Sequence, residues 1–429
     1  MRETKDSGVP WIGEIPIGWK LLRNKNAFLC SKEIVGNKSA KTQLLSLTTK
    51  GIKKKGPDVI GGKVPESFDT YQTVLKGQLV MCLFDLDCSA VFSGLSPFDG
   101  MISPAYKVVD CKDGMTPSFA SYWFSSVFDG RKFMHYSKNL RYTLTYDEFA
   151  VLPIAIPPLS EQNQISTFLD AKCAEINTIL EKTKASIEEY KKLEQSVITE
   201  SVTKGIRGNR PMKDSGVEWI GDIPMEWSVS QVKHQFELKT GTTPVGYDGT
   251  PSGRQLDWFT PSDILTEGCI LDVAERKLNQ SVILDSGIRL FPKGSILLVG
   301  IGATAGKVGY LQIEGYSNQQ ITALIPKTCF GKYYYYYFVK DRQRLLDNAL
   351  FTTLPIINNS YLSSVLIVNP PISEQQEIAA YLDEKCAAID SLIASKEALI
   401  AELEAYKKSL IYEYVTGKNE VLVQEGGVS

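Results

Sequence analysis

Histidine and long apolar runs are both scarce in this sequence. Only His135 and His234 occur among 429 residues, so a histidine-rich metal site or a Ser-His-Asp hydrolase has almost no residues to draw on. The longest apolar run, residues 295–301, is far shorter than the roughly 20 residues that a membrane-spanning helix needs. We therefore expect no membrane span and neither of these two kinds of catalytic site.

Cysteine is present but sparse. The eight cysteines form no Cys-x-x-Cys pair, which favours free thiols in a reducing compartment over a disulfide scaffold. The first six residues carry charges and no apolar segment follows them, so we expect no signal peptide. These observations predict a cytoplasmic protein.

The length and composition indicate a globular protein with more than one domain. Hydrophobic residues make up 43% of the chain and charged residues 22%, and 429 residues exceed what one ordinary core accommodates. Charge is uneven, because residues 1–156 hold 20 Lys and Arg against 15 Asp and Glu, whereas residues 370–429 hold 5 against 11. The basic first segment suits a phosphate-bearing partner, although an enzyme surface can have the same balance.

The strongest pattern is an internal duplication. Residues 5–20 return as residues 213–228 with eleven of sixteen positions identical. Residues 157–180 return as residues 370–393 with twelve of twenty-four positions identical. The two offsets, 208 and 213, differ by only five residues, so the chain has the plan A–B–A′–B′.

This plan predicts five segments. Gly205, Gly208 and Pro211 interrupt the helical pattern where the two halves join. The predicted segments are a first mixed domain (1–156), a first helical spacer (157–205), a second mixed domain (206–369), a second helical spacer (370–418) and a C-terminal tail (419–429).

Both B segments have the pattern of long helices. Ser160 and Ser373 each follow Pro-Pro-aliphatic and precede Glu-Gln, which predicts a helix N-cap at each serine. Apolar residues then recur at three- and four-residue intervals, without Gly or Pro, as in a coiled-coil seam. The seam residues are Leu169, Cys173, Ile176, Leu180, Ile187, Leu382, Cys386, Ile389, Ile393 and Ile400. Because neither apolar stripe is stable in water, we predict an antiparallel coiled coil of the two helices with internal pseudo-two-fold symmetry.

The A blocks predict mixed α/β domains that are mostly sheet. They are rich in Gly, Thr, Val and aromatic residues, and Lys76-Gly77 and Lys293-Gly294 each precede an apolar run typical of a strand. Between their shared ends the two blocks are only weakly alike. The predicted fold class is therefore α+β, with one scaffold that carries two different binding faces.

Two segments resemble catalytic or cofactor motifs but fit them poorly. Residues 300–305 match G-x-G-x-x-A, yet Val308 and its successors predict a strand where a dinucleotide site needs a helix. The Asn-Pro-Pro-Ile segment at residues 369–372 resembles the motif of amino-methyltransferases, but Ile372 lacks the aromatic ring that stacks on an extruded base. We interpret these segments as a glycine-rich β turn and as a strand-to-helix connector.

The aromatic run at residues 333–338 has two interpretations. It would form a platform for stacking nucleic-acid bases, but six consecutive rings cannot all face one way on a helix. We favour a helix that buries rings in the core of the second domain, with residues 119–124 as its counterpart in the first. His135 and His234 have no ligand-like neighbours in the sequence, so we expect ordinary structural roles for both.

Several motifs, in the same order in both halves, carry a resemblance to a known family. Pro-Pro-x-Ser-Glu-Gln opens both long helices, at residues 157–162 and 370–375, and each helix continues with a Leu-Asp pair at residues 169–170 and 382–383. Further matching segments are 138–149 in the first block and 241–244, 258–263 and 318–320 in the second. Over nearly its whole length the chain resembles the specificity subunit of type I restriction-modification systems.

This resemblance implies a non-catalytic DNA-binding subunit. In that family two target-recognition domains, separated by two helical spacers, read a bipartite and asymmetric sequence of double-stranded DNA. The subunit recruits two methyltransferase subunits, which bind S-adenosylmethionine, and restriction subunits, which use ATP and Mg²⁺. The resemblance therefore implies that this chain itself binds no cofactor. The acidic outer faces of the B helices are then docking surfaces for methyltransferase helices, or else ordinary solvated faces.

Basic and amide side chains of both A blocks are candidate DNA contacts. Lys and Arg suit phosphate, whereas Arg, Asn and Gln also suit base edges. The candidates are Lys50, Lys53, Lys54, Lys55, Lys138, Asn139, Arg141, Arg254, Gln255, Arg276, Lys277, Asn318 and Gln319.

The sequence leaves two other functions open. A stand-alone adenine DNA methyltransferase would account for the Asn-Pro-Pro segment and the glycine-rich turn, and it would bind S-adenosylmethionine without a partner. A coiled-coil scaffold with no nucleic-acid partner would show no salt-sensitive retention on DNA.

Overall fold

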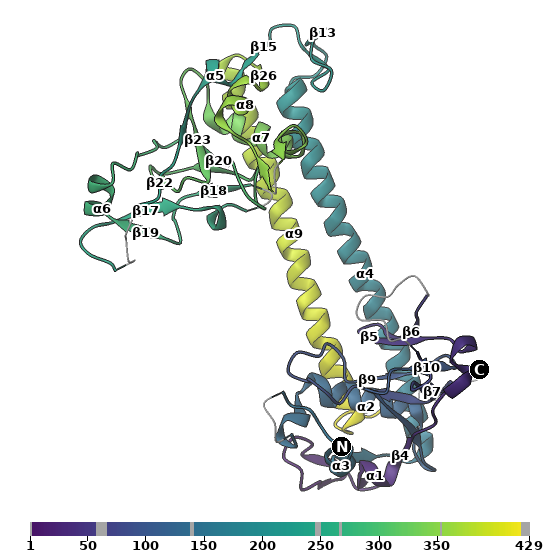
Figure 1. Cartoon of the computed structure of the whole chain (residues 1–429). Helices are drawn as coiled ribbons and strands as arrows, with labels where there is room; N and C mark the ends of the chain where they lie inside the picture. Colours follow the sequence, from purple (N-terminus) through teal and green to yellow (C-terminus); the bar gives the residue numbers. More distant parts are fainter. Residues whose placement is uncertain are drawn as a thin grey trace. The chain divides into compact units, whose positions relative to one another are not determined.

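The computed structural model describes residues 2–56, 67–137, 141–244, 250–265, 268–351 and 354–421. The chain forms two compact units: unit 1 is residues 1–184 with 397–429, and unit 2 is residues 185–396. Each unit combines one mixed domain with part of helix α4 (Leu159–Lys204) and part of helix α9 (Ile372–Val415) (Figure 1). Among the helices described, none is both long enough and apolar enough to cross a membrane.

The domain of unit 1 is built from short antiparallel strands with helices packed on them. Its central sheet has the strand order β4 (Phe28–Ser31), β11 (Lys107–Cys111), β8 (Leu79–Met81), β9 (Ser93–Leu95). Four more strand pairs flank it: β1 (Thr4–Asp6) with β2 (Glu14–Pro16), β3 (Lys20–Arg23) with β12 (Pro153–Ile156), β5 (Leu45–Thr48) with β6 (Gly51–Lys54), and β7 (Gln72–Val74) with β10 (Gly100–Ile102). The helices are α1 (Asn24–Ala27), η1 (Gly36–Lys41), α2 (Pro117–Asp129), η2 (Lys132–His135) and α3 (Tyr146–Val151).

The domain of unit 2 has a larger sheet. Its strand order is β16 (Phe236–Thr240), β23 (Ile321–Pro326), β20 (Ile296–Val299), β21 (Val308–Leu311), β18 (Cys269–Leu271), with β18 parallel to β21. The other strands are β13 (Met212–Asp214), β14 (Asp222–Pro224), β15 (Ser228–Gln231), β26 (Leu366–Asn369), β17 (Gln255–Phe259), β19 (Lys277–Asn279), β22 (Tyr316–Ser317), β24 (Leu350–Phe351) and β25 (Pro355–Ile356). The helices are α5 (Val232–Gln235), η3 (Pro261–Asp263), α6 (Gln280–Asp285), α7 (Gly331–Asp347) and α8 (Asn359–Ser364).

The two domains share one frame, as the duplication predicts. The hairpin β1–β2 corresponds to β13–β14, the pair β3–β12 corresponds to β15–β26, and α2 corresponds to α7. The four-stranded order β4-β11-β8-β9 recurs as β16-β23-β20-β21. Unit 2 differs mainly by the added strand β18 and the three-stranded sheet β19-β17-β22.

Helices α4 and α9 run antiparallel and side by side within each unit (Figure 1). In unit 1, Leu169 and Leu180 of α4 share an apolar core with Leu410 of α9, and the rings of Phe168 and Tyr414 lie 4.5 Å apart. In unit 2, Val202 of α4 shares a core with residues of the first turns of α9. Eight of the predicted seam residues are buried, and Ile393 and Ile400 are half-buried. The predicted packing of the two helices is therefore confirmed.

The predicted N-caps are wrong. The helices begin at Leu159 and Ile372, so Ser160 and Ser373 lie exposed inside the first turn. The first turn is instead held by the glutamine of each motif: Nε2 of Gln162 donates to Pro157 O and Nε2 of Gln375 donates to Pro370 O, both over 2.9 Å. A side-chain amide both donates and accepts, so it can join the helix start to the domain below, which a serine cap cannot.

Three local predictions are confirmed. Residues 300–307 connect β20 to the antiparallel strand β21, so the glycine-rich segment is a β turn and does not open a helix. The run 333–338 lies in α7, and all six rings are buried. All eight cysteines are free thiols.

Candidate nucleic-acid interface

The hairpin β5–β6 of unit 1 carries the densest group of lysines. Alternation places Leu47 and Ile52 in the core of the domain, whereas Lys53, opposite Ser46, is exposed. Residues 49–50 form the turn, and Gly51, at a φ of +85°, opens β6 and accepts at its carbonyl from the Thr48 hydroxyl over 2.7 Å. The apolar face thus fixes the hairpin on the domain and directs Lys53 to the surface.

The ammonium groups of this hairpin are available to an anion. Lys50, Lys53 and Lys54 are exposed and Lys55 is half-buried. Within the described ranges, none of the four Nζ atoms makes a hydrogen bond or an ion pair, although Lys54 Nζ lies 4.8 Å from the centre of the Phe98 ring. A two-stranded ribbon with unpaired lysines has the shape and the charge to follow a DNA groove or its phosphates.

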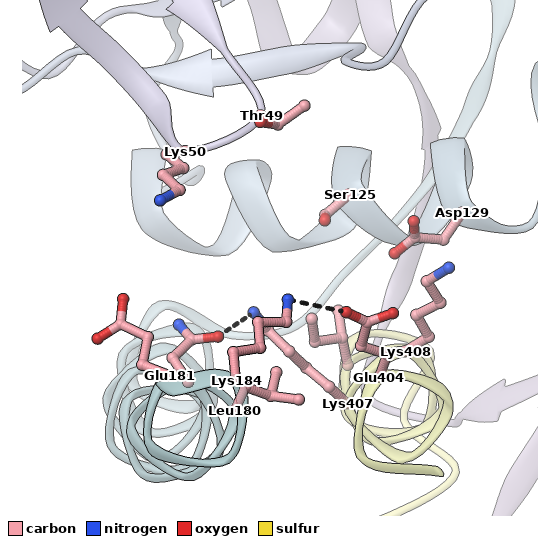
Figure 2. A pocket seen from close by; sticks show the side chains of 12 residues that line it. Thr49, Lys50, Ser125, Asp129, Leu180, Glu181, Lys184, Glu404, Lys407 and Lys408 are labelled. Carbon is pink, nitrogen blue, oxygen red and sulfur yellow. Dashed lines mark hydrogen bonds and ion pairs between the residues drawn. The ribbon is translucent and has the colours of Figure 1, made fainter. Parts of the chain in front are cut away.

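A groove of about 780 Å³ lies beside this hairpin within unit 1. Figure 2 shows Lys50 of the hairpin and Asp129 of α2 facing side chains of α4 and α9. Lys407 Nζ donates to Asn177 Oδ1 over 2.7 Å, and Lys184 lies 3.6 Å from Glu404. Burial raises the pKa of Asp129, and the nearby Lys408 and Lys407 offset part of that rise. The mixed charge makes this a polar recess beside the hairpin and not an apolar ligand site.

Only part of the second basic group of unit 1 lies among the described residues. Lys138 and Asn139 lie outside the described residues. Arg141 is described, and its Nη1 lies 3.5 Å from Asp85 Oδ1 with the Arg141 side chain 75% exposed. The exposed guanidinium is free to meet a second partner.

In unit 2, two of the predicted contacts are engaged by the domain itself. Lys277 Nζ lies 3.4 Å from Asp257, its partner across β17–β19. Nε2 of Gln255 donates to Ser252 O over 3.2 Å and also to Asn279. Both side chains therefore brace the strand ends, a role that competes with DNA contact.

The other basic candidates of unit 2 are exposed. Arg254 and Arg276 precede β17 and β19 respectively, and their carbonyls accept from Gln280 N over 2.9 Å and Trp258 N over 3.1 Å. Both backbones are fixed while both side chains face solvent, which suits a contact with phosphate.

Asn318 and Gln319 belong to an amide cluster at the end of β22. Asn318 is buried, and its Nδ2 donates to Gln320 Oε1 over 3.0 Å. Gln319 is exposed and pairs with Thr243. Gly241 packs against the backbone here, because a Cβ on it would stand 2.3 Å from Asn318 O. Gln320, which was not among the sequence candidates, thus belongs to the same group.

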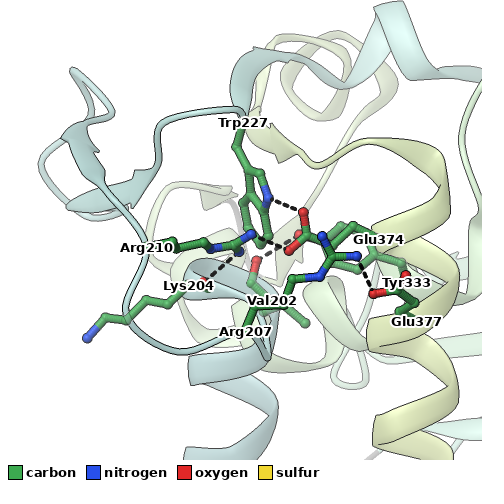
Figure 3. A network of polar contacts seen from close by, with 8 residues as sticks. All are labelled: Val202, Lys204, Arg207, Arg210, Trp227, Tyr333, Glu374 and Glu377. Carbon is green, nitrogen blue, oxygen red and sulfur yellow. Dashed lines mark hydrogen bonds and ion pairs between the residues drawn. The ribbon is translucent and has the colours of Figure 1, made fainter.

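A second set of residues, which was not predicted from the sequence, joins each domain to the long helix that follows it. In unit 2, Glu374 of α9 accepts from Trp227 Nε1 over 2.9 Å and pairs with Arg210 over 2.6 Å (Figure 3). Arg207 donates to Glu377 over 2.6 Å in the same network.

Unit 1 contains the same arrangement. Glu161 accepts from Trp19 Nε1 over 3.0 Å and from Arg2 over 2.5 and 2.8 Å. The arginines at residues 2 and 210 are 208 residues apart, which is the offset of the first repeat. Extending the repeat alignment upstream by three residues would have found them.

A tyrosine and the Asp of the Leu-Asp pair make a further repeated contact. Tyr122 donates to Asp170 over 2.6 Å, and Tyr336 donates to Asp383 over 2.7 Å. Burial, together with the neighbouring carboxylate, raises the pKa of both tyrosines, so each phenol stays protonated and donates. These contacts explain why an aspartate follows the seam leucine in both helices.

The asparagine side chain of the Asn-Pro-Pro segment is already hydrogen-bonded within the domain. Asn369 Nδ2 donates to Ser230 Oγ over 2.8 Å, and Asn369 Oδ1 accepts from Tyr334 over 2.7 Å. An amide engaged on both atoms is not presented to a base. Among the residues whose placement is described, no three His, Cys, Asp or Glu side chains gather as metal ligands would.

Comparison with known proteins agrees with this arrangement. Residues 224–405 match the family described as Type I restriction modification DNA specificity domain. The chain is 30% identical over 215 residues to the Type I restriction enzyme MjaIX specificity subunit of Methanocaldococcus jannaschii, covering 48% of each chain. It is 22% identical over 280 residues to the EcoKI specificity subunit of Escherichia coli, covering 63% of this chain and 58% of that relative. The chain thus spans about half to three fifths of the lengths of these relatives.

Solved structures share the fold over almost the whole chain. The HsdS subunit from Thermoanaerobacter tengcongensis has a TM-score of 0.52 at 16% identity, covering 94% of this chain and 98% of that one. A chain from work on complex assembly and conformational transition of the type I R-M system has a TM-score of 0.73 at 17% identity, covering 94% and 99%. The shared fold is that of two mixed domains with two long helices. The match to the specificity-domain family thus covers residues 224–405, and the likeness in fold to solved structures extends over nearly the whole chain.

Proposed function

We propose that this chain is the non-catalytic, DNA-sequence-reading subunit of a type I restriction-modification complex. Each domain recognises one half-site, so the target is bipartite, and because the two domains differ the target is asymmetric. The observation that carries the proposal is that the two domains share the same arrangement of strands and helices but present different side chains at their surfaces. The contacts of Glu161 and Glu374 are identical in kind, whereas unit 1 presents a lysine-rich hairpin and unit 2 presents an amide cluster.

The partners follow from this role. Two methyltransferase subunits would supply S-adenosylmethionine chemistry, and restriction subunits would supply ATP-driven cleavage with Mg²⁺. The exposed faces of α4 and α9 are the surfaces on which the methyltransferase subunits dock. The complex works in the cytoplasm, where its DNA and both nucleotide cofactors occur.

A binding selection tests the proposal. The full chain, isolated with the subunits its host supplies, is incubated with a randomised duplex library, and bound DNA is sequenced at two salt concentrations. We expect one split motif whose retention falls as salt rises. A library recovered without any motif would contradict sequence reading, and the absence of any salt-sensitive retention would support the scaffold.

Calorimetry with the isolated chain separates the enzyme alternative. The proposal predicts no heat of binding for S-adenosylmethionine in the absence of the other subunits. Saturable binding by this chain alone would instead support a stand-alone methyltransferase.

A further inference from the structure

Each unit has a pair of adjoining loops at the same place in its frame, and the two pairs differ in length and in side chains. In unit 1 these paired loops are residues 82–92, between β8 and β9, and residues 141–145, before α3. In unit 2 they are residues 300–307, between β20 and β21, and residues 354–358, before α8.

One hydrogen bond joins the paired loops in both units. Leu144 N donates to Leu83 O over 2.7 Å, and Ile357 N donates to Gly300 O over 2.7 Å. The next residue is the N-cap of the following helix in each case, Thr145 or Asn358. The two pairs of loops are therefore anchored to their domains in the same way, although the connection 82–92 is longer than the connection 300–307.

The paired loops of unit 1 hold side chains in a costly conformation. Asp85 and Tyr142 adopt left-handed φ angles of 47° and 49°. For residues other than glycine this backbone conformation is strained, and such residues concentrate at functional sites. Thr143 Oγ1 accepts from Asp85 N over 3.0 Å, which holds the Asp85 backbone in place. At the second position after the hydrogen-bonded carbonyl, unit 2 has a glycine, Gly302, at a φ of 104°.

In the paired loops of unit 1 the Asp85 carboxylate lies beside the Arg141 guanidinium. The ion pair spans 3.5 Å, and the two side chains are 42% and 75% exposed. The carboxylate therefore lies beside a guanidinium that remains largely exposed to solvent. The donor fork of a guanidinium matches the O6 and N7 acceptors of guanine in the major groove.

In unit 2 the amide of Gln320, which lies just before β23 and outside the paired loops, adjoins the loop 300–307. The carbonyl of Gln320 accepts from Gly300 N over 2.7 Å, and a Cβ on Gly302 would stand 3.8 Å from Gln320 Nε2. Gln320 Oε1 accepts from Asn318 over 3.0 Å, which orients the amide. Within the part of the chain that the structure describes, Gln320 Nε2 donates no hydrogen bond. An oriented glutamine can donate from Nε2 to N7 of adenine, while the second lone pair of its Oε1 accepts from the N6 amino group.

We propose that bases are read at the paired loops of each domain: Arg141, within the paired loops of unit 1, reads a guanine in one half-site, and Gln320, which adjoins the paired loops of unit 2, reads an adenine in the other. The inference rests on the proposed function and adds to it the residues that determine specificity. The lysines of β5–β6 then contact phosphate and carry no sequence information.

Three variants of the full chain test this assignment by the same library selection. Arg141→Lys keeps the charge and loses the planar fork. Gln320→Met keeps the length of the side chain and loses its hydrogen bonds. Lys53→Gln is the matched control, because it removes a charge from the same unit outside the paired loops.

We expect Arg141→Lys to weaken the preference for G·C at one position of one half-site by about tenfold or more, and to leave the other half-site unchanged. Gln320→Met relaxes one A·T position in the other half-site by a similar factor. Lys53→Gln lowers retention of all sequences alike.

Two results overturn the assignment while the proposed function stands. In one, the wild-type chain selects a split motif that Arg141→Lys and Gln320→Met both leave unaltered. In the other, either variant alters both half-sites. If the wild-type chain selects no motif, the proposed function fails with it.

Discussion

Glu374 accepts a hydrogen bond from the indole nitrogen of Trp227 over 2.9 Å. Glu161 makes the same contact with Trp19 over 3.0 Å, and an arginine closes each network. The acidic residue of the Pro-Pro-x-Ser-Glu-Gln motif therefore ties the N-terminal hairpin of each domain to the first turn of the helix that follows it. This contact explains why the first and second repeats of the sequence recur together.

Loss of this carboxylate should destabilise unit 2 more than unit 1. The Glu374 and Arg210 side chains are only 4% and 12% exposed, whereas Glu161 and Arg2 are 18% and 27% exposed. Glu374→Gln leaves a buried arginine without its counter-charge, and we expect a loss of about 3 kcal/mol in the free energy of unfolding. The matched Glu161→Gln should lose about 1 kcal/mol. Urea denaturation of both variants measures the difference, and equal losses would contradict the burial argument.

Alkaline pH should destabilise unit 2. Burial raises the pKa of Tyr333, Tyr334 and Tyr337 well above the ordinary value of 10, because the phenolate would lose its hydration. Below pH 10 these tyrosines are neutral in both the folded and the unfolded chain, so they impose no pH dependence. Above pH 10 only the unfolded chain ionises, so stability falls as the pH rises.

Denaturation midpoints measured on both sides of pH 10 check this prediction. Tyr337→Phe, which removes one of the buried phenols, should make the alkaline decline shallower. A wild-type midpoint that stays flat above pH 10 would mean that these phenols are not shielded from solvent as the structure has them.

The lysine hairpin should control the salt dependence of DNA binding. Lys53→Ala removes an exposed ammonium group, and if it neutralises one phosphate the slope of log affinity against log salt should fall by about 1. Lys277→Ala is the control, because Lys277 is already paired with Asp257 over 3.4 Å. Fluorescence anisotropy at several salt concentrations gives both slopes. A larger change for Lys277→Ala would move the phosphate contact away from β5–β6.

The end of α9 should be sensitive to one added methyl group. Gly417 has a φ of +74°, and a Cβ there would stand 2.4 Å from Pro16 Cδ. Gly417→Ala therefore combines backbone strain of about 1 kcal/mol with a steric clash. Gly8→Ala has a similar φ of +69° but meets nothing within 4 Å, so it measures the strain alone. Thermal denaturation should show the larger loss for Gly417→Ala, and equal losses would mean that the contact with Pro16 relaxes freely.

The sequence predicted the frame well because the frame is repeated. Two different segments each recur once, at offsets of 208 and 213, and this repetition indicates which residues serve packing. Eight of the ten predicted seam residues are buried. The aromatic run was also predicted correctly, because six rings exceed what one exposed helix face can present. Periodicity and repetition are properties of the chain itself and need no knowledge of distant contacts.

The candidate site was harder to predict because its chemistry depends on contacts between distant segments. In the sequence Lys277 has no evident counter-charge. In the structure Asp257 lies opposite it on the paired strand. The Gln320 carbonyl accepts a hydrogen bond from Gly300 N, which lies twenty residues earlier in the sequence. Arg141 forms an ion pair with Asp85, which is also distant in the sequence. The N-cap prediction was wrong for a similar reason, because Gln162 also accepts from Thr116 N over 2.8 Å, a partner far away in the sequence.

The most direct test of the account is the methylome of a host that carries the intact complex, compared with one in which residues 206–369 are replaced by the corresponding domain of a relative. The account predicts a methylated split motif in which the replacement changes one half and leaves the other half intact. Replacement that changes both halves, or neither, would contradict the claim that each unit reads its own half-site.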